Sequence, residues 1–164
     1  MSYDDSHYDR ALICRNGHVV NSMARDYPSS NSPYCASCGE PTISKCPNCN
    51  TDIRGYYHVP GVIGFDHYNA PAFCHQCGKL FPWTQAALSA AKELINTFDT
   101  ISGEEKVSLE GALPDLVRDT PRTKLAEAKY RTVIKKVGKE AADGLRSILV
   151  DIASEAVKKS LFGT

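Results

Sequence analysis

Four short pairs of sulfur and imidazole side chains occupy the first half of this 164-residue chain. The pairs are Cys14/His18, Cys35/Cys38, Cys46/Cys49 and Cys74/Cys77, and they use all seven cysteines. A tetrahedral metal site takes four ligands, so four pairs make two complete sites with no cysteine left over. Three of the pairs have the C-x-x-C spacing, which lets two sulfurs of one tight turn face a single ion.

The donor set predicts two structural Zn²⁺ ions. In the second site, 24 residues separate Cys49 from Cys74, a spacing typical of a zinc ribbon. The first site needs His18 as its fourth ligand, beside three cysteines. With all ligands supplied by protein, neither ion keeps an open position for water, which argues against catalytic zinc. Four thiolates also suit iron, so the residues leave zinc and iron open at the second site.

Two pairing schemes are compatible with these spacings. The sequential scheme joins the first pair with the second and the third with the fourth. A cross-braced scheme joins the first with the third and the second with the fourth. Only seven residues separate Cys38 from Cys46, which suits a link between consecutive ribbons and favours the sequential scheme.

Metal would stabilise units that are too small to fold on a hydrophobic core. Each ribbon spans roughly 30 residues, below the ~40 at which an apolar core alone is sufficient. The first residues, MSYDDSHYDR, lack the basic and apolar regions of a signal peptide. No apolar run reaches the ~18–20 residues of a membrane span. We therefore expect a cytoplasmic protein, where thiols stay reduced and paired cysteines bind metal more often than they form disulfides.

Short strands are expected around the cysteine pairs. Residues 11–20 suggest a hairpin that turns at Asn16-Gly17, and 42–44 a single strand. The segment 53–65 is rich in aromatic and β-branched residues and is interrupted by glycine, which predicts a second hairpin. Residues 1–10 are polar and are expected to be frayed or lightly docked.

The composition changes at Pro82-Trp83, where helical periodicity begins. The fold class is therefore α+β, with a double zinc ribbon over 1–82 and a C-terminal unit of three or four α-helices over 83–164. The helix starts that the sequence offers are Thr84 as an N-cap, the capping box Ser102-x-x-Glu105, and Thr120 followed by Pro121. We expect Pro114 to end the second helix, Gly138 to break or bend the third, and a last helix to run over about 140–160.

An aromatic group crowds the second ribbon: Tyr56, Tyr57, His58, His67 and Tyr68. These rings either form a recognition surface for a base, a peptide or a partner helix, or cover a sparse core and dock onto the helices. His58 and His67 would be acid/base groups in an enzyme. Nothing supplies a nucleophile or paired carboxylates at fixed spacing, so we expect no enzymatic activity.

The stretch 122–139 is strongly basic, with a net charge of plus six. Its candidate contact residues are Lys129, Arg131, Lys135 and Lys136. They would bind phosphates, or form a solvated face that meets acidic groups. The apolar stripe of the last helix would pack within the chain, pair with a second copy, bind another protein, or insert at a membrane surface.

The layout CRNGH…YCASCG…KCPNCN…FCHQCGK resembles a double zinc ribbon. The fuller string, including IRGYYHVPG and FPW, resembles an uncharacterised bacterial family that joins such a ribbon to a helical C-terminal region. The resemblance implies binding or scaffolding rather than catalysis. We therefore expect an adaptor or regulatory subunit that binds another protein or itself. The alternative is a nucleic-acid-binding protein that uses the basic helix and the ribbon aromatics.

Overall fold

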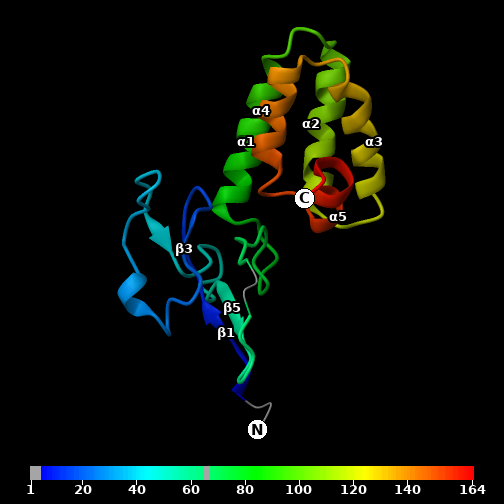
Figure 1. The fold of residues 1–164 in the computed structure, drawn as a ribbon. Helices are drawn as coiled ribbons and strands as arrows, with labels where there is room; N and C mark the ends of the chain where they lie inside the picture. The colour runs from blue at the N-terminus through cyan, green and yellow to red at the C-terminus, as the bar shows by residue number, and fades with distance from the viewer. Residues whose placement is uncertain (1–4, 65–66) are drawn as a thin grey trace. The chain divides into compact units, whose positions relative to one another are not determined.

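Two small antiparallel sheets form the framework of the N-terminal half in the computed structural model (Figure 1). The structure describes residues 5–64 and 67–164. Strand β2 (Leu12–Cys14) lies between β3 (Val19–Asn21) and β4 (Thr42–Ile43), and β1 (His7–Arg10) pairs with β5 (Arg54–His58). The predicted hairpin over 11–20 is confirmed, because β2 pairs with β3 across a turn in which Gly17 has a φ of 89°. The short strand at 42–44 is confirmed as β4.

The prediction of a hairpin within 53–65 is wrong for the described residues. Only β5 forms there, and its partner is the N-terminal strand β1, with Tyr8 opposite Tyr57. Residues 65 and 66 lie outside the described residues. Composition indicates that a segment is extended, but it does not specify which distant strand supplies the hydrogen bonds.

Residues 7–10 form strand β1 and are docked, which is one of the two expectations for residues 1–10; residues 1–4 lie outside the described residues. Asp9 on β1 is buried, and its carboxylate accepts hydrogen bonds from the backbone amides of Arg25 (2.9 Å) and Asp26 (3.2 Å). The carboxylate therefore satisfies two amides of a distant turn, which ties β1 to the rest of the sheet framework.

The chain divides into two compact units, Met1–Thr84 and Gln85–Thr164, called here the ribbon unit and the helical unit. The ribbon unit has a small core that includes two of its cysteines. Its buried members are Ala11, Ile13, Cys46, Ile53, Cys74, Phe81 and Trp83. The α-helices are confined to the C-terminal half, and short strands and one 3-10 turn, η2 (Pro28–Ser30), precede them, so the α+β class is confirmed.

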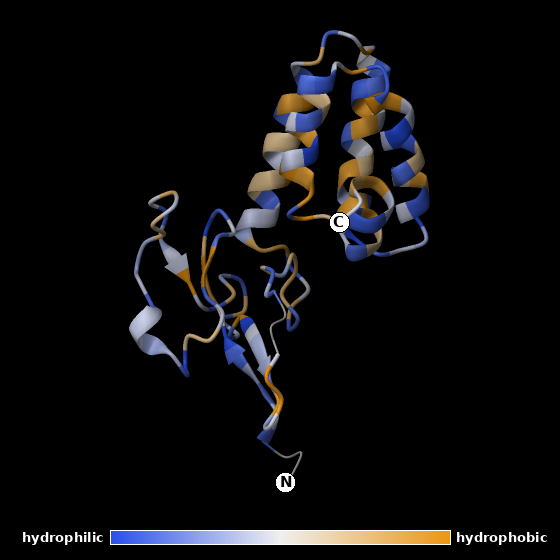
Figure 2. Ribbon diagram, in the orientation of Figure 1, coloured by the Kyte–Doolittle hydropathy of each residue, from blue (hydrophilic) through white to orange (hydrophobic). Residues whose placement is uncertain are grey.

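The helical elements follow one another with short connections, and Figure 2 shows hydrophobic and hydrophilic residues alternating along them. Within the helical unit, fully buried leucines from two helices, α2 and α4, form part of the core: Leu109, Leu113, Leu116, Leu145 and Leu149. No helix in the described part of the chain is both long and apolar enough to cross a membrane. The elements are α1 (Pro82–Asn96), α2 (Gly103–Val117), α3 (Thr123–Ile134), α4 (Lys139–Leu149), α5 (Glu155–Val157) and the π-helical turn η3 (Lys158–Phe162).

Two of the three predicted helix starts need correction, and one is confirmed. Ser102 and Glu105 form both hydrogen bonds of a capping box at the start of α2. Helix α1 begins at Pro82, and the hydroxyl of Thr84 donates to the carbonyl of Ala72 (3.0 Å) instead of capping the helix. Helix α3 begins at Thr123; Thr120 still accepts from the amide of Arg122, at 3.2 Å.

The last helix is shorter than predicted. Gly138 separates α3 from α4, as expected, but α4 ends at Leu149, and Ser154 caps the short helix α5. The amide of Ser154 donates to the carbonyl of Leu116 at 3.1 Å, and this hydrogen bond holds the connection between α4 and α5 against α2. The apolar stripe nonetheless packs within the helical unit, since Leu145, Leu149 and Val157 are fully buried.

Pro114 lies inside α2 and does not end it. Proline removes one backbone hydrogen bond and crowds the preceding turn, at a cost of about 3 kcal/mol in a helix interior. Burial of Leu113, Leu116 and Val117 on the same stretch offsets that cost. Tertiary packing therefore outweighs the local preference on which the prediction depended.

Replacing Pro114 with alanine should stabilise the helical unit. Pro114 is exposed, so alanine restores the missing amide without leaving a cavity. We expect the free energy of unfolding to rise by about 2 kcal/mol, because the gained hydrogen bond and helix propensity exceed the lost chain stiffness. Urea unfolding followed by circular dichroism measures the change. A decrease would show that the proline ring contributes packing of its own.

Candidate metal centres

The three C-x-x-C turns share one backbone pattern. In each, the amide of the first cysteine donates to the carbonyl five residues on, and the residue after the second cysteine donates back to the first. The bonds join Cys35 with Glu40 and Gly39, Cys46 with Thr51 and Asn50, and Cys74 with Lys79 and Gly78, all at 2.8 to 2.9 Å. Gly39, Asn50 and Gly78 all have positive φ, at 76°, 62° and 72°. Glycine or asparagine is needed there because other side chains disfavour this conformation.

The structure gathers Cys14, His18, Cys35 and Cys38 into one cluster. Cys14 is the last residue of β2 and His18 follows the next turn, while the first C-x-x-C turn presents Cys35 and Cys38. His18 Nδ1 lies 3.4 Å from Cys14 Sγ and 3.6 Å from Cys35 Sγ. Cys14 Sγ and Cys38 Sγ are 3.7 Å apart.

The second cluster contains Cys46, Cys49, Cys74 and Cys77. The Sγ atoms of Cys46 and Cys77 are 3.8 Å apart, and those of Cys49 and Cys74 are 3.7 Å apart. Cys46 and Cys74 are also members of the ribbon unit's core, so this cluster and the apolar packing depend on each other. Both clusters have the sequential arrangement of pairs.

These distances fit tetrahedral Zn²⁺. With Zn–S bonds of about 2.3 Å, tetrahedral geometry places sulfurs about 3.8 Å apart, and sulfur about 3.6 Å from a ligating nitrogen. Within each cluster the donor atoms all lie within 4.8 Å of one another. A disulfide would need sulfurs about 2 Å apart, and all seven cysteines are free thiols. The eight side chains would hold one ion per cluster and supply structural cross-links.

The environment lowers the pKa of two cysteines in each cluster, Cys35 and Cys38 in the first and Cys49 and Cys77 in the second. Hydrogen bonds from the backbone of Glu40 and the side chain of Asn16 lower the pKa of Cys38 to about 6. The side chain and backbone of Thr51 lower the pKa of Cys49 to about 6. By contrast, burial raises the pKa of Cys46 to about 11. Since thiolate is the form that binds metal, Cys38 and Cys49 are ready ligands at neutral pH.

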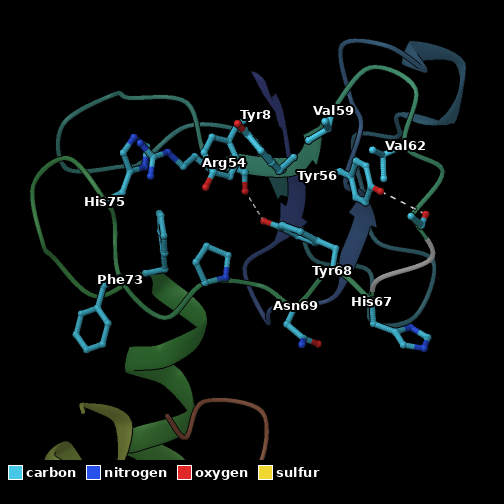
Figure 3. Close-up of a pocket in the computed structure, with 15 residues that line it drawn as sticks. Tyr8, Arg54, Tyr56, Val59, Val62, His67, Tyr68, Asn69, Phe73 and His75 are labelled. Atoms are coloured by element: carbon cyan, nitrogen blue, oxygen red, sulfur yellow. Dashed lines mark hydrogen bonds between the residues drawn. The ribbon is translucent and has the colours of Figure 1, made fainter. Parts of the chain in front are cut away.

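Four of the five predicted aromatic residues line a cavity of about 590 Å³ in the ribbon unit (Figure 3). They are Tyr56, Tyr57, His67 and Tyr68. The hydroxyl of Tyr68 donates to the carbonyl of Arg54 (2.6 Å), and that of Tyr56 donates to Gly64 (3.3 Å). His58 is not part of this wall; its ring lies 5.3 Å from that of His7, across the β1–β5 pair.

Several cavity residues escape sequence reasoning, among them Tyr8, Arg54, Phe73 and His75. The guanidinium of Arg54 lies 4.6 Å from the ring centroid of Tyr8, which in turn packs against Tyr57 at 4.7 Å. Tyr8 reaches the cavity through pairing of β1 with β5, for which the sequence carries no local signal. Arg54 lies two residues before the predicted aromatic run, and this proximity in the sequence could have indicated it as a cavity residue.

Two of the four predicted basic contact residues have partners within the helical unit. Arg131 donates from Nη2 to both the carbonyl (3.1 Å) and the hydroxyl (2.8 Å) of Ser160. Lys136 forms an ion pair with Glu105. Lys129 lines a shallow hollow of about 350 Å³ between α2 and α3, and Lys135 directly follows α3. The basic run therefore contributes to the packing of the helical unit.

The fold and the two clusters define a class of protein: a double ribbon with two four-ligand clusters suited to zinc, followed by a helical unit. The chain matches, over residues 7–161, the model of a family described as "Uncharacterized protein conserved in bacteria (DUF2321)", and it belongs to that family. The predicted resemblance to an uncharacterised bacterial family is thereby confirmed. No curated protein and no solved structure matched the chain.

Proposed function

We propose that this protein is a non-enzymatic adaptor, in which two structural Zn²⁺ ions hold a ribbon unit that binds another protein. The observation that carries the proposal is the clustering of exposed apolar side chains on the ribbon unit. Five of the nine exposed large apolar residues in the described part of the chain line the aromatic cavity or the hollow beside it: Tyr8, Val19, Tyr57, Val62 and Ile63. Contiguous exposed apolar surface of this kind marks interaction sites.

The donor sets support the non-enzymatic part of the proposal. Each cluster offers four protein ligands to one ion, which leaves no coordination position for a substrate or an activated water. Zinc rather than iron is favoured at the first cluster by its mixed imidazole and thiolate donors. The second cluster suits either ion by its ligands, and the proposal assigns zinc to both.

Protein is favoured over nucleic acid as the partner by the charges. With both clusters holding Zn²⁺, the ribbon unit carries a net charge of about −4, because seven thiolates outweigh two divalent ions. Phosphate-rich chains would be repelled from that unit. In the helical unit, Arg131 and Lys136 already have partners. The apolar stripe of α4 and α5 is buried, so a partner is expected at the ribbon unit and not at these helices.

Affinity purification tests the proposal. The tagged full-length protein is purified from its host in 50 mM and in 200 mM salt, and the bound material is identified by mass spectrometry and nuclease treatment. We expect a protein that is retained at both salt concentrations and that rebinds after purification in a defined ratio. Binding to phosphates weakens steeply over this range. Recovery of DNA or RNA that is lost at 200 mM salt would contradict the proposal.

A further inference from the structure

We infer that the aromatic cavity of the ribbon unit is a docking site for a peptide segment of a partner protein, with an aromatic side chain inserted and one neighbouring carboxylate bound by Arg54. This inference rests on the proposed function and specifies the partner's chemistry. It depends on three features of the cavity: its apolar walls, the guanidinium of Arg54, which forms no ion pair with the described residues, and the exposed apolar surface beside it.

The walls of the cavity suit a flat apolar group. Rings of Tyr56, Tyr68, Phe73 and Phe81 contribute to the lining, and Pro71 completes it on one side. In Figure 3, Tyr68 lies across the middle of the view, below Arg54 and Tyr8. A volume of about 590 Å³ accommodates an aromatic side chain together with adjoining peptide. Aromatic rings pack favourably in such walls, in offset or edge-to-face contact.

Arg54 supplies the cation that an anionic group would bind. Within residues 5–64 and 67–164, the ion pairs formed by arginine and lysine do not include Arg54. Its guanidinium stacks over the Tyr8 ring, which holds it in place with its hydrogen-bond donors available. A carboxylate accepts two parallel hydrogen bonds from a guanidinium, which adds direction as well as attraction.

The surroundings favour a peptide over a small molecule. A second hollow of about 490 Å³ adjoins the cavity, with which it shares the lining residues Tyr56, Val62, Gly64, His67 and Tyr68. At the shared rim, Val62 is 62% exposed and Ile63 is 86% exposed. In Figure 2 the segment that follows β5 is hydrophobic. A ligand that fills the cavity alone would leave this surface in water, whereas an extended segment would cover it.

The net charge of the ribbon unit limits the bound peptide to one carboxylate near the aromatic side chain that enters the cavity. The zinc-loaded ribbon unit has a net negative charge, so a run of acidic residues would be repelled while a single one is matched by Arg54. The same balance disfavours a nucleic acid strand, although bases also stack on aromatic rings. The occupant is therefore an aromatic residue with Asp or Glu within about two positions, flanked by apolar residues.

The chain carries its own reporter for this site. Trp83 is the one tryptophan in the sequence. Its ring stacks on Phe81, with centroids 4.6 Å apart, and its Nε1 donates to the carbonyl of Pro71 at 2.8 Å. Both Phe81 and Pro71 line the cavity. Occupation of the cavity is therefore expected to change the fluorescence of Trp83.

The test first selects peptides that bind the protein and then measures their affinity. Phage-displayed random heptapeptides are selected on the zinc-loaded full chain, and a tryptophan-free peptide with the enriched pattern is titrated while Trp83 fluorescence is followed. We expect an aromatic residue with a nearby Asp or Glu. Arg54→Met should weaken binding about tenfold, as loss of one charged hydrogen-bonded pair does. In that variant, peptides with Asp and with Asn should bind equally.

Matched variants separate the site from general effects. Val62→Ser should weaken binding severalfold, while Val107→Ser, at a valine on α2 that is even more exposed, should not. Lys124→Met serves as the charge control on α3. Zinc content and the emission of free Trp83 must be unchanged in every variant compared. Failure to enrich any pattern, or binding that is indifferent to Arg54→Met, would overturn the inference.

Failure of the inference is distinguishable from failure of the proposed function. A purified natural partner that binds the wild type, Arg54→Met and Val62→Ser equally would leave the adaptor function standing and place docking elsewhere. Tighter binding of oligothymidylate than of any selected peptide, with displacement of the peptide, would overturn both. Binding to phospholipid vesicles without peptide binding would overturn the inference as well.

Discussion

Cys49→Ser is expected to unfold the second ribbon, the part of the ribbon unit around the second cluster, and to halve the zinc content of the purified protein from two ions to one. Cys49 Sγ lies 3.7 Å from Cys74 Sγ in the second cluster, and serine cannot replace its thiolate. Structural Zn²⁺ contributes about 10–16 kcal/mol of apparent binding free energy to units of this kind. The core of the ribbon unit is too small to compensate, and two of its members, Cys46 and Cys74, belong to this cluster.

Three measurements check this expectation. Metal analysis gives the zinc content, Trp83 fluorescence should shift toward the emission of exposed tryptophan, and circular dichroism should retain most of its helical signal. Trp83 is 4% exposed in the folded ribbon unit, so its emission reports directly on that core. The helical unit has its own buried leucines and is expected to stay folded. Loss of both signals in one transition would show that the two units fold as one.

Gln76→Ala is the matched control in the same turn. The backbone amide of Gln76 donates to Cys74 Sγ at 3.4 Å, and alanine keeps that amide. We therefore expect two bound ions and unchanged Trp83 emission. Destabilisation by this variant would mean that any change in the turn, and not the loss of a ligand, explains the effect of Cys49→Ser.

Gly55→Ala is expected to destabilise the ribbon unit by about 3 kcal/mol, the upper range for overpacking. A Cβ at Gly55 would lie 2.2 Å from the carbonyl oxygen of Ser22 and 2.9 Å from the carbonyl carbon of Arg10. Both obstacles are backbone atoms, so relief requires that strands move. The move would also break the hydrogen bond from Tyr56 N to Ser22 O, which measures 2.8 Å.

Urea unfolding of the zinc-loaded protein, followed by Trp83 fluorescence, measures the loss at Gly55. The control is Gly111→Ala in α2, where a Cβ would meet nothing within 4 Å. That substitution should stabilise the helical unit by about 0.5–1 kcal/mol, since alanine has the higher helix propensity. Equal changes in the free energy of unfolding for the two substitutions would contradict the close approach of the Ser22 and Arg10 backbone to Gly55.

The metal clusters are the part of the site that sequence reasoning anticipated most closely. C-x-x-C turns close locally, through hydrogen bonds between residues at most five apart, so ligands and turn geometry follow from adjacent residues. The capping box at Ser102 and Glu105 is equally local and was anticipated for the same reason. Pro114 shows the limit of local reasoning, because long-range burial keeps α2 helical through a residue that disfavours it.

The aromatic cavity was anticipated only in part. Tyr56, Tyr57, His67 and Tyr68 were singled out by composition, but Tyr8 reaches them from β1. Gly55 was interpreted as an interruption of a hairpin, whereas its lack of a side chain lets three stretches of backbone meet. Such meetings depend on which distant segments come together, and residue spacing does not encode them directly.

The sequence by itself indicated the eight residues of the two clusters and the division into short strands followed by helices, because these depend on spacing within a few residues. Tertiary structure alone decided that the N-terminal strand pairs with β5, that Arg54 stacks over Tyr8, and that exposed apolar residues surround one cavity. The physical reason is the range of the interactions. Turns and caps are closed by neighbouring atoms, whereas a cavity wall forms from segments that only the folded chain brings into contact.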